Sequence, residues 1–241
     1  MIRPPASFIT VYMVPNPNEL HALADKIHGL DVSRGTLGYA FQNDASVLAV
    51  VDGVGVGTVL HEVFHLAVRS SYGAIPQWMD EGMASLYETC TRVGDRFLGE
   101  PNWRALVFKE MGLNFVPLGQ VIASPWFSDE PGTSSDRRRS PDEQAYMMAM
   151  ARYFALYLQE QGQLKKVFDA YRGRKPASGF VPAATQAVQL VEGAVGLPIA
   201  TIETQFRAWY PQVRDPQLRI HIGKPIEKGI PNELFERAKN P

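Results

Sequence analysis

The sequence of 241 residues contains one cysteine, Cys90, so an intrachain disulfide cannot form. A structural zinc site built from several thiolates is excluded for the same reason. The chain also lacks an excess of charge of either sign, because 24 Lys and Arg residues oppose 25 Asp and Glu residues, for a formal net charge of -1. This balance gives no electrostatic case for nucleic acid or an anionic membrane as a partner.

Long hydrophobic runs are absent as well. No stretch reaches the roughly 18 consecutive apolar residues of a membrane span, and Met1 to Pro5 lack the basic and apolar blocks of a signal peptide. If the chain is part of a longer precursor, a secreted or periplasmic location is favoured. Dense basic charge is confined to Arg137 to Arg139, which we expect in a solvated loop from Pro125 to Pro141. The oligomeric state stays open.

The central motif of the chain is His61-Glu62-Val63-Phe64-His65. On a helix, His61 and His65 are about 40° apart around the axis and about 6 Å apart along it, so their imidazoles project together and can hold one zinc ion. Glu62 lies about 100° around, where its carboxylate can reach an activated water without being a ligand. The pattern therefore indicates a zinc site with Glu62 as the general base.

A catalytic zinc site usually has three protein ligands, and Glu81 is the best candidate for the third. Pro76 precedes a second helix-forming segment in which Glu81 falls in an early turn. The loop expected from Arg69 to Ile75, with Gly73 as its breaker, is long enough to fold this helix back against the first. The predicted ligands are thus His61, His65 and Glu81. A metal-bound imidazole usually donates a hydrogen bond from its second nitrogen, and the nearby candidates for such supporting contacts are Asp80, Ser85 and Glu88.

The combination of HEVFH and WMDEGMA resembles the gluzincin branch of zinc metallopeptidases, in which H-E-x-x-H is followed on a neighbouring helix by a W-x-x-E-G-x-A motif. The sequence is most similar to the small peptidase-MA-like domains of that branch. The resemblance implies His61, His65 and Glu81 as ligands and Glu62 as base. It also implies a zincin-like α+β fold with a small N-terminal lobe of sheet and helix, a mainly helical C-terminal lobe, and the metal between them.

Two further expectations follow from the resemblance. Gluzincins commonly use a Tyr or His of the helical lobe to stabilise the oxyanion, and Tyr146 is the choice by position, with Tyr153 and Tyr157 as rivals. An edge strand of the sheet pairs with the extended substrate, and Ser46 to Val51 is the candidate strand.

The N-terminal part, about residues 1–88, is predicted to begin with a strand from Ser7 to Val14. A helix then runs from an N-cap at Asn18 to Gly29. His21 and His28 fall on this helix and are interpreted as surface or partly buried residues, not ligands. Thr36 to Phe41 and Ser46 to Val51 are expected to pair as an antiparallel hairpin.

The helical part is predicted over about residues 89–210, and an irregular tail over 211–241, with His221 in a short strand. The longest helix is expected from Asp142 to Gln161, as the core of this part. The other segments, in chain order, are a connector from Phe97 to Pro101, helical turns within Trp103 to Met111, irregular structure from Val116 to Gly119, a helix from Leu164 to Tyr171, a loop from Arg172 to Pro182, and helices from Ala183 to Val195 and Pro198 to Trp209. All are assigned to one catalytic domain, residues 1–241.

The function predicted from these residues is hydrolysis of a peptide or protein substrate by a zinc metallopeptidase. One alternative is a non-catalytic binding module that keeps the zincin framework and its metal. Intact Glu62 argues against it, because a purely structural zinc site needs no base. Another alternative is a helical structural domain in which the His-Glu-His cluster is fortuitous.

Overall fold

The computed structural model describes residues 8–33, 35–51, 56–73, 75–110, 116–123, 140–172 and 184–221. These residues form an α+β structure that is mostly helical. The chain divides into two compact units, one of residues 1–71 with 221–241 and one of residues 72–220. The basic run at 137–139 and most of the expected loop from Pro125 to Pro141 lie outside the described residues, as do residues 173–183 and the tail after 221.

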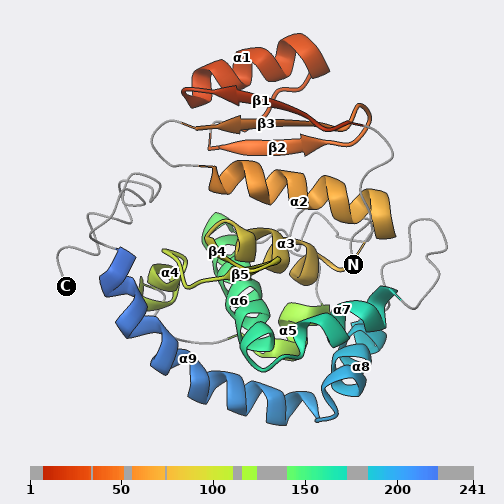
Figure 1. Ribbon diagram of the computed structural model, residues 1–241, viewed down its shortest axis with the longest axis vertical. Helices are drawn as coiled ribbons and strands as arrows, with labels where there is room; N and C mark the ends of the chain where they lie inside the picture. The colour runs from red at the N-terminus through yellow and green to blue at the C-terminus, as the bar shows by residue number, and fades with distance from the viewer. Residues whose placement is uncertain are drawn as a thin grey trace. The chain divides into compact units, whose positions relative to one another are not determined.

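The first unit contains a three-stranded sheet and two helices (Figure 1). In chain order they are β1 (Thr10–Val14), α1 (Pro17–His28), β2 (Gly38–Phe41), β3 (Ser46–Val50) and α2 (Gly57–Tyr72). The strand order is β1-β3-β2, with β1 parallel and β2 antiparallel to β3. The predicted hairpin of β2 and β3 is confirmed.

The choice of Ser46 to Val51 as an edge strand is wrong, because β3 lies between β1 and β2. All five of its residues are buried, and four of them, Val47 to Val50, form an uninterrupted apolar run, which is typical of a strand covered on both faces. Leu48 and Val50 pack in one cluster with Leu20 of α1, whereas Val47 packs in another with Leu66 of α2. The two helices therefore cover opposite faces of the sheet.

Helix α1 begins two residues earlier than predicted. The side chain of Asn16, not Asn18, accepts a hydrogen bond from the backbone N–H of Glu19, and Pro17 occupies the first turn, where its missing N–H costs nothing. The predicted end at Gly29 is confirmed by its left-handed backbone, with φ of 64°.

The second unit consists of seven helices and a two-stranded sheet among its described residues. They are α3 (Gln77–Tyr87), β4 (Cys90–Val93), β5 (Arg96–Gly99), α4 (Ala105–Glu110), α5 (Leu118–Ala123), α6 (Pro141–Glu160), α7 (Leu164–Arg172), α8 (Ala184–Val195) and α9 (Ile199–His221). Helix α3, grouped with the N-terminal part in the sequence analysis, packs here against α6. A Cβ at Gly82 would lie 2.8 Å from the carbonyl oxygen of Ala151, so only glycine permits this approach.

Helix α6 is the core element that the sequence predicted, and its residues 151–158 are all buried. A capping box between Ser140 and Glu143 fixes its start. It is not the longest helix, because α9 has 23 residues against 20 for α6. The expected irregular tail is wrong up to His221, which ends α9 and is not in a strand.

Two other segments differ from the predictions. The expected connector at Phe97 belongs to the β4–β5 hairpin, whose turn contains Gly94 with φ of 64°. Pro117 precedes α5 and accepts hydrogen bonds from the N–H groups of Gln120 and Val121, so helix begins where irregular structure was predicted.

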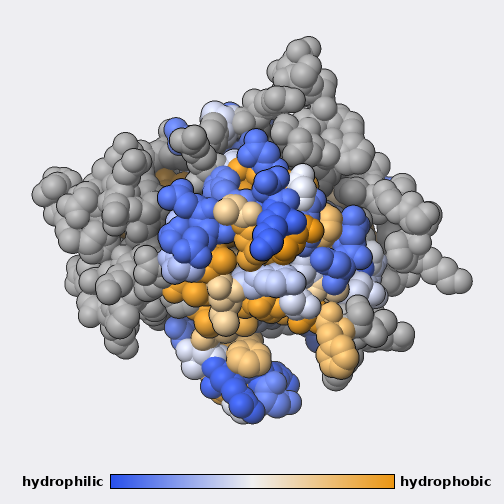
Figure 2. All heavy atoms as spheres, turned by 90° about the horizontal axis from the view of Figure 1, so that it is seen from above, coloured by the Kyte–Doolittle hydropathy of each residue, from blue (hydrophilic) through white to orange (hydrophobic). Residues whose placement is uncertain are grey.

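No described helix is both long and apolar enough to cross a membrane. Hydrophilic and hydrophobic residues are interspersed over the coloured part of the face that Figure 2 shows.

Candidate metal centre

Helix α2 brings His61 and His65 to one side of its axis, as their spacing predicts. Both side chains are buried, with exposed fractions of 7% and 4%. Their ring centroids are 4.8 Å apart and the ring planes are inclined by 74°. Burying two imidazoles side by side costs folding free energy unless their nitrogens form hydrogen bonds or bind a metal.

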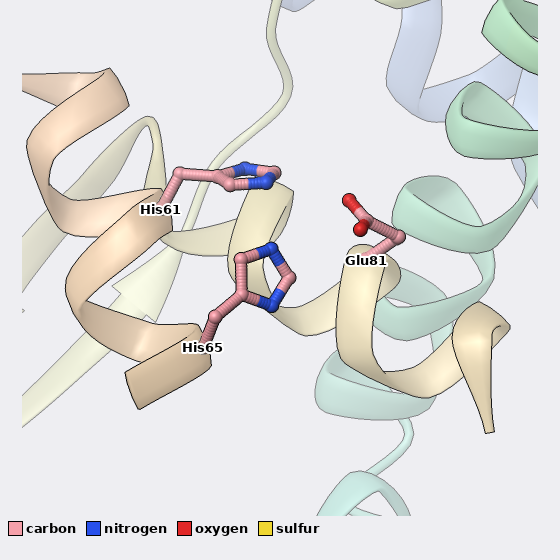
Figure 3. A group of neighbouring side chains, drawn as sticks. All are labelled: His61, His65 and Glu81. Atoms are coloured by element: carbon pink, nitrogen blue, oxygen red, sulfur yellow. The ribbon is translucent and has the colours of Figure 1, made fainter. Parts of the chain in front are cut away.

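Glu81 comes from the second turn of α3, which begins at Gln77 directly after Pro76. Figure 3 shows its carboxylate directed toward the two imidazoles of α2. One potential ligand atom from each of the three residues lies within 4.8 Å of the other two. The connection between α2 and α3 is shorter than the loop predicted from Arg69 to Ile75, because α2 continues to Tyr72. The helix ends before Gly73, whose φ is 75°. Both predicted helices thus supply the donors that the sequence assigned to them.

The donor set fits a zinc ion. Two imidazoles and one carboxylate form a ligand set found in catalytic zinc sites. Bonds of about 2.0–2.1 Å to a tetrahedral ion place ligand atoms roughly 3.3 Å apart, so a separation of 4.8 Å, the upper bound in this group, would have to close by about 1.5 Å. Side-chain rotations can supply such a change. Within the described ranges, this is the one group of three or more His, Cys, Asp and Glu side chains placed to hold a metal.

Glu62 lies beside the donor group on α2 without belonging to it. Its position one residue after His61 turns it about 100° around the helix axis. The Cγ atom of Glu62 would lie 3.4 Å from a Cβ built on Gly38 of β2. The sheet therefore supports this side chain from one side. Sequence reasoning missed Gly38, for which the only signal was a glycine at the start of a strand.

The three tyrosines weighed as oxyanion donors are all buried in the second unit. Burial raises the pKa of Tyr146 to about 12, against smaller lowering effects of Arg207 and a backbone hydrogen bond at Val116. The hydroxyl of Tyr153 donates to the backbone carbonyl of Asn102, at 2.9 Å. The hydroxyl of Tyr157 donates to a Gln205 side chain, at 3.0 Å.

The three candidates for supporting the ligands differ in their surroundings. Glu88 forms an ion pair with Arg104, with 2.6 Å between Oε1 and Nη2, and it accepts a hydrogen bond from Asn102. The hydroxyl of Ser85 donates to the backbone carbonyl of Glu81 at 2.5 Å, one turn earlier in α3. Asp80 is buried next to Glu81, with an exposed fraction of 6%.

The histidines of α1 are not in the donor group. The side chain of His28 is 1% exposed, and its ring nitrogens lie within hydrogen-bonding distance of Tyr39, Asp44 and Ser46. His28 as a whole is partly buried, as predicted, although its side chain is almost fully enclosed by these contacts.

Comparison with models of known protein families finds no match for this sequence, and a search of the curated proteins finds no relative.

Proposed function

We propose that this protein is a zinc-dependent metallopeptidase of zincin-like fold. His61, His65 and Glu81 would hold the zinc, and Glu62 would act as general base. One observation carries the proposal: two histidines four apart on α2 and a glutamate of α3 gather their ligand atoms within 4.8 Å. The order His-Glu-x-x-His supplies a base beside the ligands, which a purely structural zinc site does not need.

Zinc bound at these residues would activate a water molecule and polarise the scissile carbonyl. Glu62 takes up the proton of the attacking water through its carboxylate and passes it to the leaving amine. His61 and His65 are neutral donors and Glu81 carries one negative charge, so the ligands leave net positive charge for the developing oxyanion. Tyr146 stays the proposed additional donor to that oxyanion, since a pKa of about 12 keeps its hydroxyl protonated near neutral pH.

Strand β2 takes the place of β3 as the proposed substrate strand. It has β3 on one side only in the described sheet. The N–H of Val50 donates to the carbonyl of Leu37 at 2.8 Å, and hydrogen-bonded pairs alternate along an antiparallel ladder. The backbone groups of Gly38 and Ala40 therefore point away from β3. An extended peptide can pair with them by strand addition, next to the strand position that contacts Glu62.

The test combines metal analysis with cleavage-site profiling on a peptide library in the presence of zinc. Glu62→Gln is the matched blank, because the amide keeps the size of the side chain but cannot accept the proton. We expect about one zinc per chain in both proteins and hydrolysis by the wild type alone. A protein that retains no metal after zinc loading and dialysis would refute the proposal.

If the protein is instead a non-catalytic binding module that keeps its metal, the same experiment has a different expected result. Both proteins would bind zinc, and neither would cleave any peptide in the library.

A further inference from the structure

Gly38, at the start of the edge strand β2, lies directly against α2, the helix of the candidate metal centre. A Cβ built on it would lie 2.6 Å from Cγ2 of Thr58 and 3.4 Å from Cγ of Glu62. The carbonyl oxygen of Leu48 would be 3.1 Å away. Gly38 is not among the residues with positive φ, so space and not backbone conformation requires glycine here. The missing side chain lets α2 and β2 approach each other at this point.

Thr58 is a stiff partner in this contact. It lies in the first turn of α2, and its β-branched side chain has few favourable rotamers on a helix. Thr58 and Glu62 are four residues apart, so they lie on the same face of α2 and both meet the strand at Gly38. A side chain at position 38 would push on both of them. The contact thus fixes how far the Glu62 side chain stands from β2.

We propose that Gly38 is a positioning residue for Glu62. Because Gly38 has no side chain, the Thr58 methyl group and the Glu62 methylene pack directly against β2. This packing sets the distance between the Glu62 carboxylate and a peptide that pairs with the outward backbone groups of Gly38 and Ala40. The inference rests on the proposed function and extends it to a residue outside the H-E-x-x-H motif. Misplacing a reacting group by about 1 Å can cost about 10²-fold in rate, so this contact is worth testing.

The experiment compares four proteins: wild type, Gly38→Ala, Thr58→Ser and the double variant. Thr58→Ser removes the methyl group that the new Cβ would strike, so it should relieve the clash. Gly193→Ala on α8 is the control for a Gly to Ala change, because a Cβ there meets nothing within 4 Å. For each protein, kcat, KM, zinc content and melting temperature are measured, and crystal structures locate the Glu62 side chain relative to β2.

We expect Gly38→Ala to lower kcat by about 10- to 100-fold with little change in KM, to keep its zinc, and to displace Glu62 from the strand. The double variant should return both kcat and the Glu62 position close to those of Thr58→Ser. Gly193→Ala should match the wild type in kcat and in the Glu62 position.

Two results would overturn the inference while the proposed function stands. One is wild-type kcat and an unmoved Glu62 in Gly38→Ala. The other is a loss of kcat that follows the melting temperature and is not restored by Thr58→Ser, which would make Gly38 a packing residue only. A wild type that binds zinc but cleaves no peptide would instead remove the proposed function, and this inference with it.

Discussion

The hydroxyl oxygen of Tyr39 lies 2.6 Å from Nδ1 of His28, so a hydrogen bond joins the last turn of α1 to the edge strand β2. The other ring nitrogen of His28 is 3.0 Å from Oγ of Ser46 and 3.2 Å from Oδ2 of Asp44. The ring also stacks on Phe41, with 4.1 Å between centroids. One buried imidazole thus holds β2 from the face opposite to α2.

Tyr39→Phe should destabilise the protein by about 1–3 kcal/mol, because it leaves a buried nitrogen of His28 without its partner. Burial, with a smaller contribution from the charge of Asp44, raises the pKa of Tyr39 to about 12, so the hydroxyl is protonated at neutral pH. Urea unfolding measures the effect. Tyr12→Phe, at a tyrosine that is 37% exposed, is the matched control. Equal free energies of unfolding for both variants would contradict the prediction.

Asp44 should add a small stability that depends on pH. Burial raises the pKa of this carboxyl, but hydrogen bonds from Ser46 and His28 and the charge of His28 outweigh it, so the pKa lies below 3.8. A carboxyl whose pKa is lower in the folded state than in the unfolded state stabilises the folded protein at pH values above the unfolded pKa of about 3.9. This stabilisation is lost as the pH falls through the folded-state pKa.

Comparing the unfolding free energies of the wild type and Asp44→Asn at several pH values tests the direction of this pH dependence. The carboxylate is 52% exposed, so we expect a difference in unfolding free energy of less than about 1 kcal/mol at pH 6. The difference should shrink as the pH is lowered below about 4. A difference that grows on acidification would contradict the assignment.

The grouping of His61, His65 and Glu81 could be predicted from the sequence because two of its three members lie on one helix. The spacing of His61 and His65 fixes their common face once α2 forms, and the turn at Gly73 returns the chain toward a second helix that carries Glu81. The hairpin of β2 and β3 was likewise signalled by two strand-like runs around a polar turn.

The parts that could not be predicted depend on tertiary contacts. Nothing in the local sequence tells that β3 is central, since burial on both faces requires both α1 and α2. Pro211 suggested that the last helix stops, yet α9 continues past it to His221.

Glu88→Gln should lower the free energy of unfolding by about 3–5 kcal/mol without lowering the zinc content. Glu88 and Arg104 are mostly buried, with side chains 14% and 10% exposed, so removing one charge leaves the other uncompensated. Urea unfolding and metal analysis of the same preparation measure the two effects. Loss of zinc from a variant that stays folded would show that Glu88 supports the ligands instead.

Tyr146→Phe should reduce kcat by about 10²-fold if its hydroxyl stabilises the oxyanion, while zinc content stays unchanged. The hydroxyl also makes a backbone hydrogen bond at Val116, so a loss of about 1 kcal/mol in stability is expected in either case. Turnover is therefore compared at a temperature where both proteins are fully folded. An unchanged kcat, together with an effect of Tyr153→Phe or Tyr157→Phe, would reassign the donor and leave the zinc chemistry intact.

Alanine at His61, His65 or Glu81 should abolish stabilisation by zinc, whereas Glu62→Gln should keep it. A ligand that binds only the folded state at a free concentration of about 100 times its Kd adds about 2.7 kcal/mol, which for a chain of this length raises Tm by about 5 to 10 °C. The measurement is Tm of the chelator-treated protein with and without added zinc. Glu62→Gln is the control on the same helix, because it changes charge beside the site but removes no donor of the group. A zinc-dependent rise in Tm that survives in all three alanine variants would place the metal elsewhere, and a rise absent from the wild type would rule out zinc at this group.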